Sequence, residues 1–506
     1  MVREKMLKKS RIDLISYPPH DSRMKSTLFK IVIAGFLTAS CVQKKEVVAP
    51  SPVMPVPSAA QLEWHEMEMN AFIHFTINTF TDQEWGYGDE STATFNPSAL
   101  NVDQWVTTLK DAGFEGIILT TKHHDGFCLW PTQYSQHSVK NSPYQGGKGD
   151  IVREVSDACK KHGLKFGIYV SPWDRNRADY GTPAYVEYYR NQLKELFTAY
   201  GPVFEMWFDG ANGGDGYYGG AREKRRIDGS TYYEWPTTLN IVRQMEPNVI
   251  FFSDAGPGVR WVGNERGIGG ETNWNSITPD TLFAGKAGIE KLLEMGSENG
   301  TQWIPAEVNV SIRPGWFYHP KEDTLVKPAE KLFDIYLSSV GRGSTLLLNV
   351  PPDRRGLFHE NDVKALQGWR TMLDREFKTD LAKNAVVEAT SYRGGNSSYS
   401  PLNVTDDDKE TYWATDDDIT TASLELHFES MISVKYILLQ EYIKLGQRVK
   451  EFNVEIWRDD AWMKAADATT IGYKRILKIE PVNTNKIRVN ITASKACPLI
   501  SSIGIY

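Results

Sequence analysis

Asp209 is the side chain whose setting in this sequence most strongly suggests chemistry. It directly follows the apolar residues Met206, Trp207 and Phe208 and precedes the sequence Gly-Ala-Asn. Burying a carboxylate beside such a run is costly unless the group reacts or accepts hydrogen bonds. An aspartate that caps a helix or turns the chain at the start of a loop is the alternative interpretation of the same spacing.

Three histidines follow apolar runs in a similar way. His74 follows Ile73, and His123 and His124 are adjacent after the apolar run at 115–121. A neutral imidazole donates one hydrogen bond and accepts another, which suits the hydroxyls of a sugar. The alternative is that one histidine of the pair faces the core and the other caps a loop.

A metal site is the weaker interpretation of these histidines. Metallohydrolase barrels need several His ligands on successive strands, whereas His74 is alone on its strand. Only His319, His359 and His427 follow Asp209 in the sequence. We therefore predict no catalytic metal and no cofactor.

Tryptophan is abundant around the candidate residues. Most of these rings are expected in the core, but a ring at a strand end or in the following loop can stack on a sugar. The candidate substrate-binding aromatics are Trp85, Tyr169, Trp173, Trp261 and Trp316. Carboxylates, imidazoles and aromatic faces together predict glycoside hydrolysis.

The elements that must position these residues alternate between amphipathic helices and short apolar strands over about 64–380. Such alternation is typical of a parallel sheet covered on both faces. Helices are expected at 101–113, 151–163, 185–200, 237–245, 329–340 and 357–380. Strands are expected at 70–75, 115–121, 164–170, 203–208, 249–253, 304–312 and 345–350. Seven strands in about 300 residues favour a (β/α)8 barrel, and the dinucleotide-binding motif Gly-x-Gly-x-x-Gly does not follow the first strand.

After about residue 383 the pattern changes to short alternating runs with turn residues between them, which predicts a β-sandwich. The expected strands are 385–390, 423–428, 434–440, 451–457, 475–479, 486–491 and 499–505. The predicted domains are therefore a barrel at 62–382 and an all-β sandwich at 383–506.

Residues 1–41 resemble a secretory signal region. A cationic start at Lys25 and Lys30 precedes a short apolar run and small residues before Cys41, as in the lipidated cysteine of bacterial lipoproteins. We expect translation to begin at Met24, and the Pro-rich residues 42–61 to form an extended tether. The protein is then exported to the bacterial periplasm or cell surface and meets the membrane only through its lipid anchor.

Composition restricts the function classes further. The chain has 506 residues, a formal net charge of −7 and 12 % aromatic residues, which exclude a disordered or coiled-coil chain. No concentrated basic face is evident, so nucleic acid is not an expected partner. The cysteines Cys128, Cys159 and Cys497 have no close pairing, and no disulfide framework is predicted.

Five motifs together resemble glycoside hydrolase family 29, the α-L-fucosidases, over about 62–380. They lie at residues 72–75, 122–127, 207–210, 260–265 and 311–317. The resemblance implies that Asp209 is the nucleophile, that His74, His123 and His124 bind fucose, and that Trp316 lies near the C5 methyl group. Its implied partners are fucosylated oligosaccharides or glycoconjugates.

The acid/base residue varies within that family. The Asn264-Glu265 motif resembles the subfamily that cleaves α-1,3/1,4-linked fucose in branched Lewis-type glycans, which implies Glu265. Glu271 is the second candidate, and Glu307 is the third, although its apolar context suggests a structural role. The implied reaction is a retaining double displacement. A broad or α-1,2-acting fucosidase, and a non-catalytic glycan-binding lipoprotein, are the alternatives.

The last domain resembles the discoidin or coagulation-factor type C module through residues 392–400, 403–413 and 503–506. Such modules often bind glycans and can carry a structural Ca²⁺ near the acidic turn at 406–408. A sandwich that only stabilises the barrel is the alternative.

Overall fold

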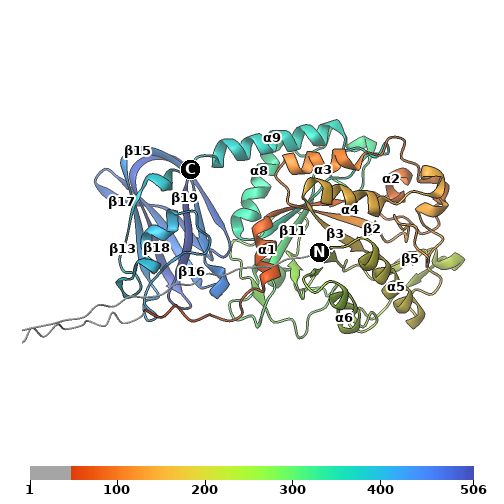
Figure 1. Ribbon diagram of the computed structural model, residues 1–506, viewed down its shortest axis with the longest axis horizontal. Helices are drawn as coiled ribbons and strands as arrows, with labels where there is room; N and C mark the ends of the chain where they lie inside the picture. The colour runs from red at the N-terminus through yellow and green to blue at the C-terminus, as the bar shows by residue number, and fades with distance from the viewer. Residues whose placement is uncertain (1–46) are drawn as a thin grey trace, which may run out of the picture. The chain divides into compact units, whose positions relative to one another are not determined.

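The computed structural model describes residues 47–506, and in this range eight parallel strands close into a barrel (Figure 1). Strand β1 pairs with β2 on one side and with β12 on the other, which closes the ring. In chain order the barrel strands are β1 (Met69–Ile73), β2 (Gly116–Lys122), β3 (Lys165–Val170), β4 (Glu205–Trp207), β7 (Ile250–Ser253), β8 (Val259–Trp261), β11 (Ala306–Ser311) and β12 (Thr345–Asn349). The predicted barrel is confirmed, and all seven expected strands belong to it.

The eighth strand, β8, was not among the expected strands. It is only three residues long, and Arg260 at its centre interrupts the apolar run. The Arg260 guanidinium is fully buried and donates to the carbonyl oxygens of Leu293 (2.8 Å) and Trp274 (3.0 Å). Such long-range acceptors are invisible in a local pattern, which is why the strand was missed.

Helices pack around the outside of the barrel, as the alternating pattern requires. The longer ones are α3 (Val102–Asp111), α4 (Ile151–His162), α5 (Pro183–Ala199), α6 (Trp235–Met245), α8 (Ala329–Ser338) and α9 (Glu360–Phe377), with shorter α2 (Ile77–Thr81) and α7 (Glu290–Met295) in the connections. Local chemistry fixes their ends. Asp150 caps α4 by accepting from the Arg153 N–H (2.9 Å), and Gly163 ends the helix with a positive φ.

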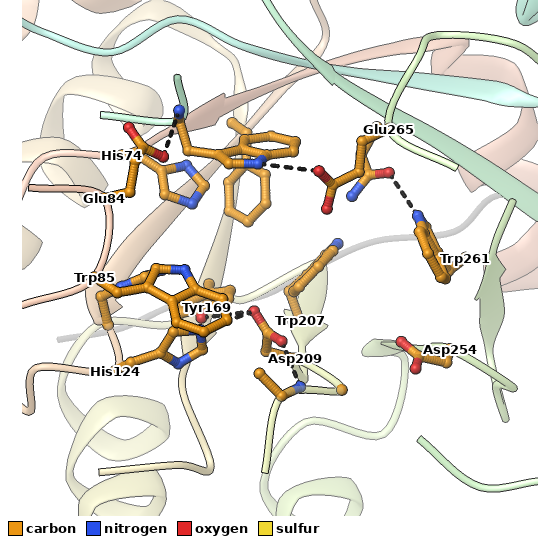
Figure 2. Close-up of a pocket in the computed structure, with 16 residues that line it drawn as sticks. His74, Glu84, Trp85, His124, Tyr169, Trp207, Asp209, Asp254, Trp261 and Glu265 are labelled. Carbon is orange, nitrogen blue, oxygen red and sulfur yellow. Dashed lines mark hydrogen bonds and ion pairs between the residues drawn. The ribbon is translucent and has the colours of Figure 1, made fainter. Parts of the chain in front are cut away.

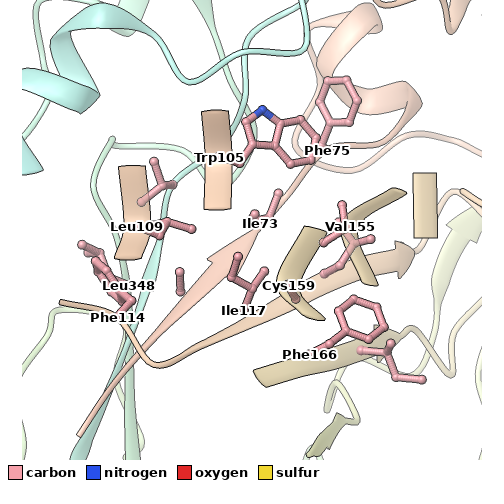
Figure 3. Close-up of a cluster of buried hydrophobic side chains, with 14 of the residues drawn as sticks. Ile73, Phe75, Trp105, Leu109, Phe114, Ile117, Val155, Cys159, Phe166 and Leu348 are labelled. Carbon is pink, nitrogen blue, oxygen red and sulfur yellow. The ribbon is translucent and has the colours of Figure 1, made fainter. Parts of the chain in front are cut away.

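The core between helices and barrel is built from the apolar faces of both. Figure 3 shows Ile73 and Ile117 from the strands beside Trp105 and Leu109 of α3 and Val155 of α4. All five side chains are fully buried, so the strand ends that carry the candidate site rest on a closely packed support.

Helix α1 (Ala59–Met67) lies at the opening of the barrel opposite the candidate site. Its Gln61 side chain donates to the carbonyl oxygens of Gly258 (2.8 Å) and Trp303 (2.7 Å), and Trp64 packs among the interior side chains of the barrel. Ser58 caps the helix with a capping box. The domain boundary expected at residue 62 therefore falls inside an ordered helix.

Residues 47–57, which we call the N-terminal strap, have no regular structure but are not a free tether. The Val53 N–H donates to the Leu445 carbonyl (2.9 Å), and the Val48 and Ser51 carbonyls accept from Arg393 (2.6 Å) and Arg448 (2.7 Å). The tether prediction is corrected from Val47 onward, because these long-range hydrogen bonds hold the strap on the C-terminal domain. The predicted signal region, Met24 and Cys41 lie outside the described residues.

The C-terminal domain is all-β, as predicted. Its antiparallel strands are β13 (Val386–Ala389), β14 (Trp413–Ala414), β15 (Ala422–Glu441), β16 (Val449–Arg458), β17 (Ala461–Thr469), β18 (Arg475–Ser494) and β19 (Leu499–Ile505). Two pairs of expected strands are merged into β15 and β18, because register shifts rather than turns separate their halves. Strand β17 was not expected, since it is largely exposed and carries few large apolar residues.

Several hydrogen bonds join the barrel to the C-terminal domain. The Gln447 side chain accepts from the Asn275 N–H (2.8 Å) and donates to the Asn273 carbonyl (2.9 Å). Asn273 N–H also donates to Thr470 Oγ1 (2.8 Å). Within residues 47–506, no helix has the length and apolar character that a membrane span requires.

Candidate active site

A cavity of about 420 Å³ opens at the carboxyl ends of the barrel strands (Figure 2). This volume lies within the range of about 300–1,000 Å³ that is usual for small-molecule sites. The residues that line it are Phe72, His74, Glu84, Trp85, His123, His124, Tyr169, Trp207, Asp209, Gly210, Ala211, Asp254, Trp261, Glu265, Asn309 and Trp316. Nine of the ten predicted site residues are in this set, and Trp173 is not.

The barrel explains why residues so far apart in the sequence meet here. His74 follows β1, and His123 and His124 follow β2. Asp209 lies two residues beyond β4, and Glu265 lies in the loop after β8. Because parallel strands end on the same face of the barrel, the following residues converge on one cavity.

The Asp209 carboxylate is held by two donors. Its Oδ1 accepts from the Ala211 N–H (2.7 Å) and its Oδ2 from the Tyr169 hydroxyl (2.9 Å). Its side chain is 23 % exposed, and His124 Nε2 lies 3.7 Å from Oδ2. The turn-forming hydrogen bond expected as the alternative therefore exists, but the side chain still lines the cavity. The two interpretations of Asp209 are compatible.

Glu265 lies at the mouth of the same cavity. Its Oε2 accepts from Trp316 Nε1 (3.3 Å). Partial burial raises the pKa of the Glu265 carboxyl, and the nearby negative charges of Asp209 and Glu84 raise it further, while the bond from Trp316 opposes the change. A raised pKa favours the protonated carboxyl, which is the form that a general acid requires.

The hydrogen-bond network assigns a role to each histidine. Asn349 donates its amide to Ser311 Oγ and the Trp316 carbonyl, so its Oδ1 accepts from His74 Nδ1 (2.8 Å). The His74 Nε2 atom is therefore left as an acceptor. Burial lowers the pKa of His74 to about 3, so the ring is neutral at pH 7.

The hydrogen-bond partners also decide which ring nitrogen carries the proton in His123 and in His124. Ser171 donates to the Trp173 carbonyl (2.6 Å), so it accepts from His124 Nδ1 (2.7 Å), and His124 Nε2 is an acceptor. The Asn78 amide donates to His123 Nδ1 (3.5 Å), so His123 Nε2 carries the proton. Burial lowers the pKa of both rings. The cavity thus presents two imidazole acceptors and one donor, a pattern that can bind several hydroxyls of one sugar.

Trp173 supports the site from behind. The prediction that it contacts substrate is corrected, because the ring is 2 % exposed and its Nε1 donates to the Tyr218 hydroxyl (2.9 Å). It packs against His124 with the ring centroids 5.1 Å apart. The hairpin β5 (Gly214–Gly216) and β6 (Glu223–Arg225) covers it, and residues 212–230 do not line the cavity.

Two carboxyl groups of the cavity were not singled out as site residues. Asp254, directly after β7, accepts from the Gly285 N–H (2.7 Å), and burial raises its pKa to about 6. Glu84 accepts from the Trp316 and Phe317 N–H groups (2.9 and 3.1 Å) and so fixes the loop that carries Trp316. The position of Asp254 at a strand end was a usable signal, whereas Glu84 has none in the local sequence.

The other two acid/base candidates are elsewhere. Glu271 is 78 % exposed in its side chain and bonds to Arg342 (3.0 Å), while its carbonyl accepts from Arg475 of the C-terminal domain. Glu307 is fully buried in the barrel interior and accepts from Trp207 Nε1 (2.9 Å). Neither carboxyl lines the cavity, and of the three candidates only Glu265 does.

The resemblance implied that a structural Ca²⁺ can lie near the acidic turn at 406–408, and the carboxylates of this turn make bonds within the chain. Asp406 accepts from the Asp408 N–H (2.9 Å) and the Thr411 hydroxyl (2.8 Å), and Asp407 pairs with Lys383. Asp406 and Asp407 are therefore bonded to groups of the chain itself. Over the described range 47–506, no group of three or more His, Cys, Asp or Glu side chains is arranged to hold a metal ion.

Comparison with known families gives two matches that divide the chain as the structure does. The alpha-L-fucosidase family model matches residues 52–376, and the F5/8 type C domain model matches residues 386–503. A curated relative, alpha-L-fucosidase 1 of Arabidopsis thaliana, is 41 % identical over 462 residues, which cover 90 % of this chain and 88 % of the relative.

Solved structures give the same result. The crystal structure of a putative alpha-L-fucosidase from Bacteroides thetaiotaomicron is 41 % identical, with a TM-score of 0.83, covering 90 % of this chain and 99 % of that one. A Ruminococcus gnavus family 29 fucosidase in complex with fucose is 32 % identical, with a TM-score of 0.82, covering 91 % and 97 %.

Proposed function

The chain belongs to glycoside hydrolase family 29 and is an α-L-fucosidase, and from this premise we propose that it releases α-1,3/1,4-linked L-fucose from branched glycans with retention of configuration. The observation that carries the proposal is the convergence of Asp209 and Glu265 on one cavity. The carboxyls differ in surroundings, since Asp209 accepts two hydrogen bonds and Glu265 has a raised pKa. A retaining glycosidase needs such a difference between its two carboxyls.

In this mechanism Asp209 attacks the anomeric carbon and Glu265 donates its proton to the leaving oxygen. The C1–O bond to the aglycone breaks as the bond to Asp209 forms, which gives a covalent fucosyl-enzyme. Glu265, now ionised, takes a proton from water, and the water oxygen displaces Asp209. The Tyr169 hydroxyl and the Ala211 N–H hold the Asp209 carboxylate in one orientation before the attack.

Two substitutions test these roles. Asp209→Ala is expected to abolish turnover of an aryl α-L-fucoside. Azide is expected to restore turnover of Glu265→Ala on an activated aryl fucoside. Because azide attacks the covalent fucosyl-enzyme, the expected product is the α-fucosyl azide and not the β-fucosyl azide. Full activity of either variant, or formation of the β product from Glu265→Ala, contradicts the assignment.

The linkage preference is supported by the position of Glu265 in the Asn264-Glu265 motif and by aromatic faces around the cavity. Trp85 is 52 % exposed, and Trp261 and Trp316 are partly exposed. Exposed rings beside a sugar pocket can pack on the further sugars of a branched aglycone. A linear substrate with fucose at its end offers fewer such contacts.

Fucose release from matched substrates tests the linkage. Residues 47–506 and the Asp209→Ala variant are incubated with Lewis a or Lewis x trisaccharide, 2′-fucosyllactose and an aryl α-L-fucoside. Release from the Lewis sugars alone, lost in the variant, is the expected result. Release mainly from 2′-fucosyllactose or the aryl fucoside rejects the linkage preference and leaves the fucosidase activity in place.

Export and lipid anchoring complete the proposal. Support comes from the sequence of residues 24–41, which combines a cationic start, an apolar run and small residues before Cys41. Expression of the full chain in a bacterium, with Cys41→Ala as the control, tests it. Recovery of the protein in the membrane fraction and its loss from that fraction in the variant are expected, whereas equal soluble recovery of both contradicts the anchor.

A further inference from the structure

Two glutamates face each other in the interior of the barrel, beneath the cavity. Glu205 begins β4 and Glu307 lies in β11, and both side chains are fully buried. Each accepts an indole N–H: Trp64 Nε1 donates to Glu205 Oε2 (3.0 Å) and Trp207 Nε1 to Glu307 Oε1 (2.9 Å). The remaining oxygens, Glu205 Oε1 and Glu307 Oε2, have no other protein partner.

No cation neutralises this pair among the described residues packed around it. Arg260 of β8 donates instead to the carbonyl oxygens of Leu293 and Trp274. His65 of α1 is neutral at pH 7, because burial lowers its pKa to about 3. The two carboxyl groups lie within hydrogen-bonding reach of each other. Two buried carboxylates in contact cannot both be ionised, so the pair retains a proton.

The titration of the pair agrees with this geometry. Burial raises the pKa of Glu307 to about 7. Burial also raises the pKa of Glu205 well above its usual value, and the charge of Glu307 raises it further. The two groups titrate as one unit, which keeps at least one proton at neutral pH.

Trp207 connects the pair to the catalytic centre. Its ring lines the cavity, and Asp209 is only two residues further along the chain (Figure 2). The ring stacks on Phe252 with centroids 3.9 Å apart and an interplanar angle of 7°. This stacking fixes the plane of the ring, and the bond to Glu307 fixes its rotation within that plane.

We propose that Glu205 and Glu307 are positioning residues, which share one proton and hold Trp207 by its indole N–H so that the floor of the fucose pocket and the adjacent Asp209 keep their catalytic geometry. The inference rests on the proposed function of the Asp209 cavity. Helix α1 takes part through Trp64, which holds Glu205 from the opposite side of the pair. Neither glutamate touches the substrate.

The first test removes the acceptor of Trp207. Glu307→Leu is compared with Glu307→Gln, which keeps an acceptor. The control is Glu195→Leu, which removes the acceptor of Trp130 Nε1 (3.1 Å) on the outer face of the barrel. For an aryl α-L-fucoside, kcat/KM of Glu307→Leu is expected to fall by at least about tenfold, because small displacements of reacting groups cost that much or more. Glu307→Gln is expected to stay within about threefold of the parent protein. Equal values for Glu307→Leu and Glu195→Leu overturn the proposal.

The second test does not depend on activity and remains informative if Glu307→Leu fails to fold. Because the folded pair binds its proton more tightly than the unfolded chain, the urea midpoint is expected to fall as pH rises from about 5 to about 8. Glu205→Gln replaces the shared proton by an amide donor, so its midpoint is expected to fall less over this range. If the urea midpoints of the parent protein and of Glu205→Gln depend on pH in the same way, the proposal of a shared proton is overturned. Activity that survives Asp209→Ala instead contradicts the proposed function, so the two failures are distinguishable.

Discussion

At the scale of single residues, the cavity holds carboxyl groups whose surroundings give them different properties. Asp209 accepts bonds from a hydroxyl and an amide, Glu265 accepts one weak bond at the mouth, and Asp254 is largely enclosed. The same functional group therefore differs in hydrogen bonding and in pKa from one position in the cavity to the next. Two predictions test these differences.

Glu265 should determine the alkaline side of the pH profile. Its raised pKa keeps it protonated to a higher pH than an ordinary glutamate, and kcat/KM is expected to decrease as that proton is lost. In Glu265→Gln the remaining activity on an activated aryl fucoside should show no such decrease. Measuring kcat/KM from pH 4 to 9 for both proteins checks this, and an unchanged alkaline limb in the variant rules Glu265 out as the titrating acid.

Asp254 should make stability depend on pH. Its pKa is raised to about 6 by burial, so the folded state loses stability as pH rises from the unfolded value near 4 through about 6. Asp254→Asn removes this loss and keeps an acceptor for the Gly285 N–H. We expect the variant to gain about 2–3 kcal/mol relative to the parent between pH 4 and pH 8. Urea unfolding at both pH values measures the difference, and an equal change in both proteins contradicts the assignment.

At the scale of elements, strands β2 and β3 and the residues that follow them form much of the cavity wall, and a buried ion pair joins the loops after the two strands. Lys122, the last residue of β2, bonds to Asp174 (3.2 Å) and Gln192 (3.0 Å), with both charged side chains fully buried. Asp174 also accepts from the Asn176 N–H (3.0 Å) and turns the loop after β3. The pair thereby sets the directions in which His123 and His124 leave β2.

Removal of the Asp174 carboxylate should strongly reduce the stability of the folded protein. Asp174→Leu leaves the Lys122 ammonium buried without its charge partner, which is expected to cost about 3–5 kcal/mol. Asp179→Leu, which breaks the partly exposed pair of Asp179 with Arg177 (2.7 Å), is the control and is expected to cost less than about 1 kcal/mol. Urea unfolding of both variants gives the comparison. Similar losses of unfolding free energy in Asp174→Leu and Asp179→Leu would contradict the expectation that the buried Lys122–Asp174 pair is the more costly one to break.

At the scale of the whole molecule, the described chain forms one unit in which the N-terminal strap, the barrel and the C-terminal domain are joined by hydrogen bonds. The strap runs on the C-terminal domain and leads into α1, whose Gln61 and Trp64 contact the barrel interior. The C-terminal domain thus supports the barrel whether or not it also binds glycans.

Loss of the strap should therefore reduce stability. A chain that begins at Gln61 lacks the Ser58 cap and the bonds of Val48, Ser51 and Val53 to the C-terminal domain. We expect the chain that begins at Gln61 to melt at a lower temperature than residues 47–506. The Ser58→Ala variant, which is expected to lose about 1 kcal/mol of stability, should melt between the two. Differential scanning calorimetry checks the order. Equal melting temperatures for the two chain lengths would show that the strap does not stabilise the folded protein.

The sequence by itself determined the barrel, the all-β domain, the family and most of the residues that line the cavity. The two domains and residues such as His74, His123 and Asp209 follow from local properties, namely strand and helix periods, apolar runs and the residue after each run. The family, and with it Glu265, came from the resemblance of five motifs. Only the tertiary structure decided that Arg260 lies in a strand, that Glu271 and Trp173 do not line the cavity, that Glu84 does, and that Glu205 meets Glu307. Each of these depends on where side chains from distant segments point and which partners they find, and the pattern of neighbours along the chain does not contain that information.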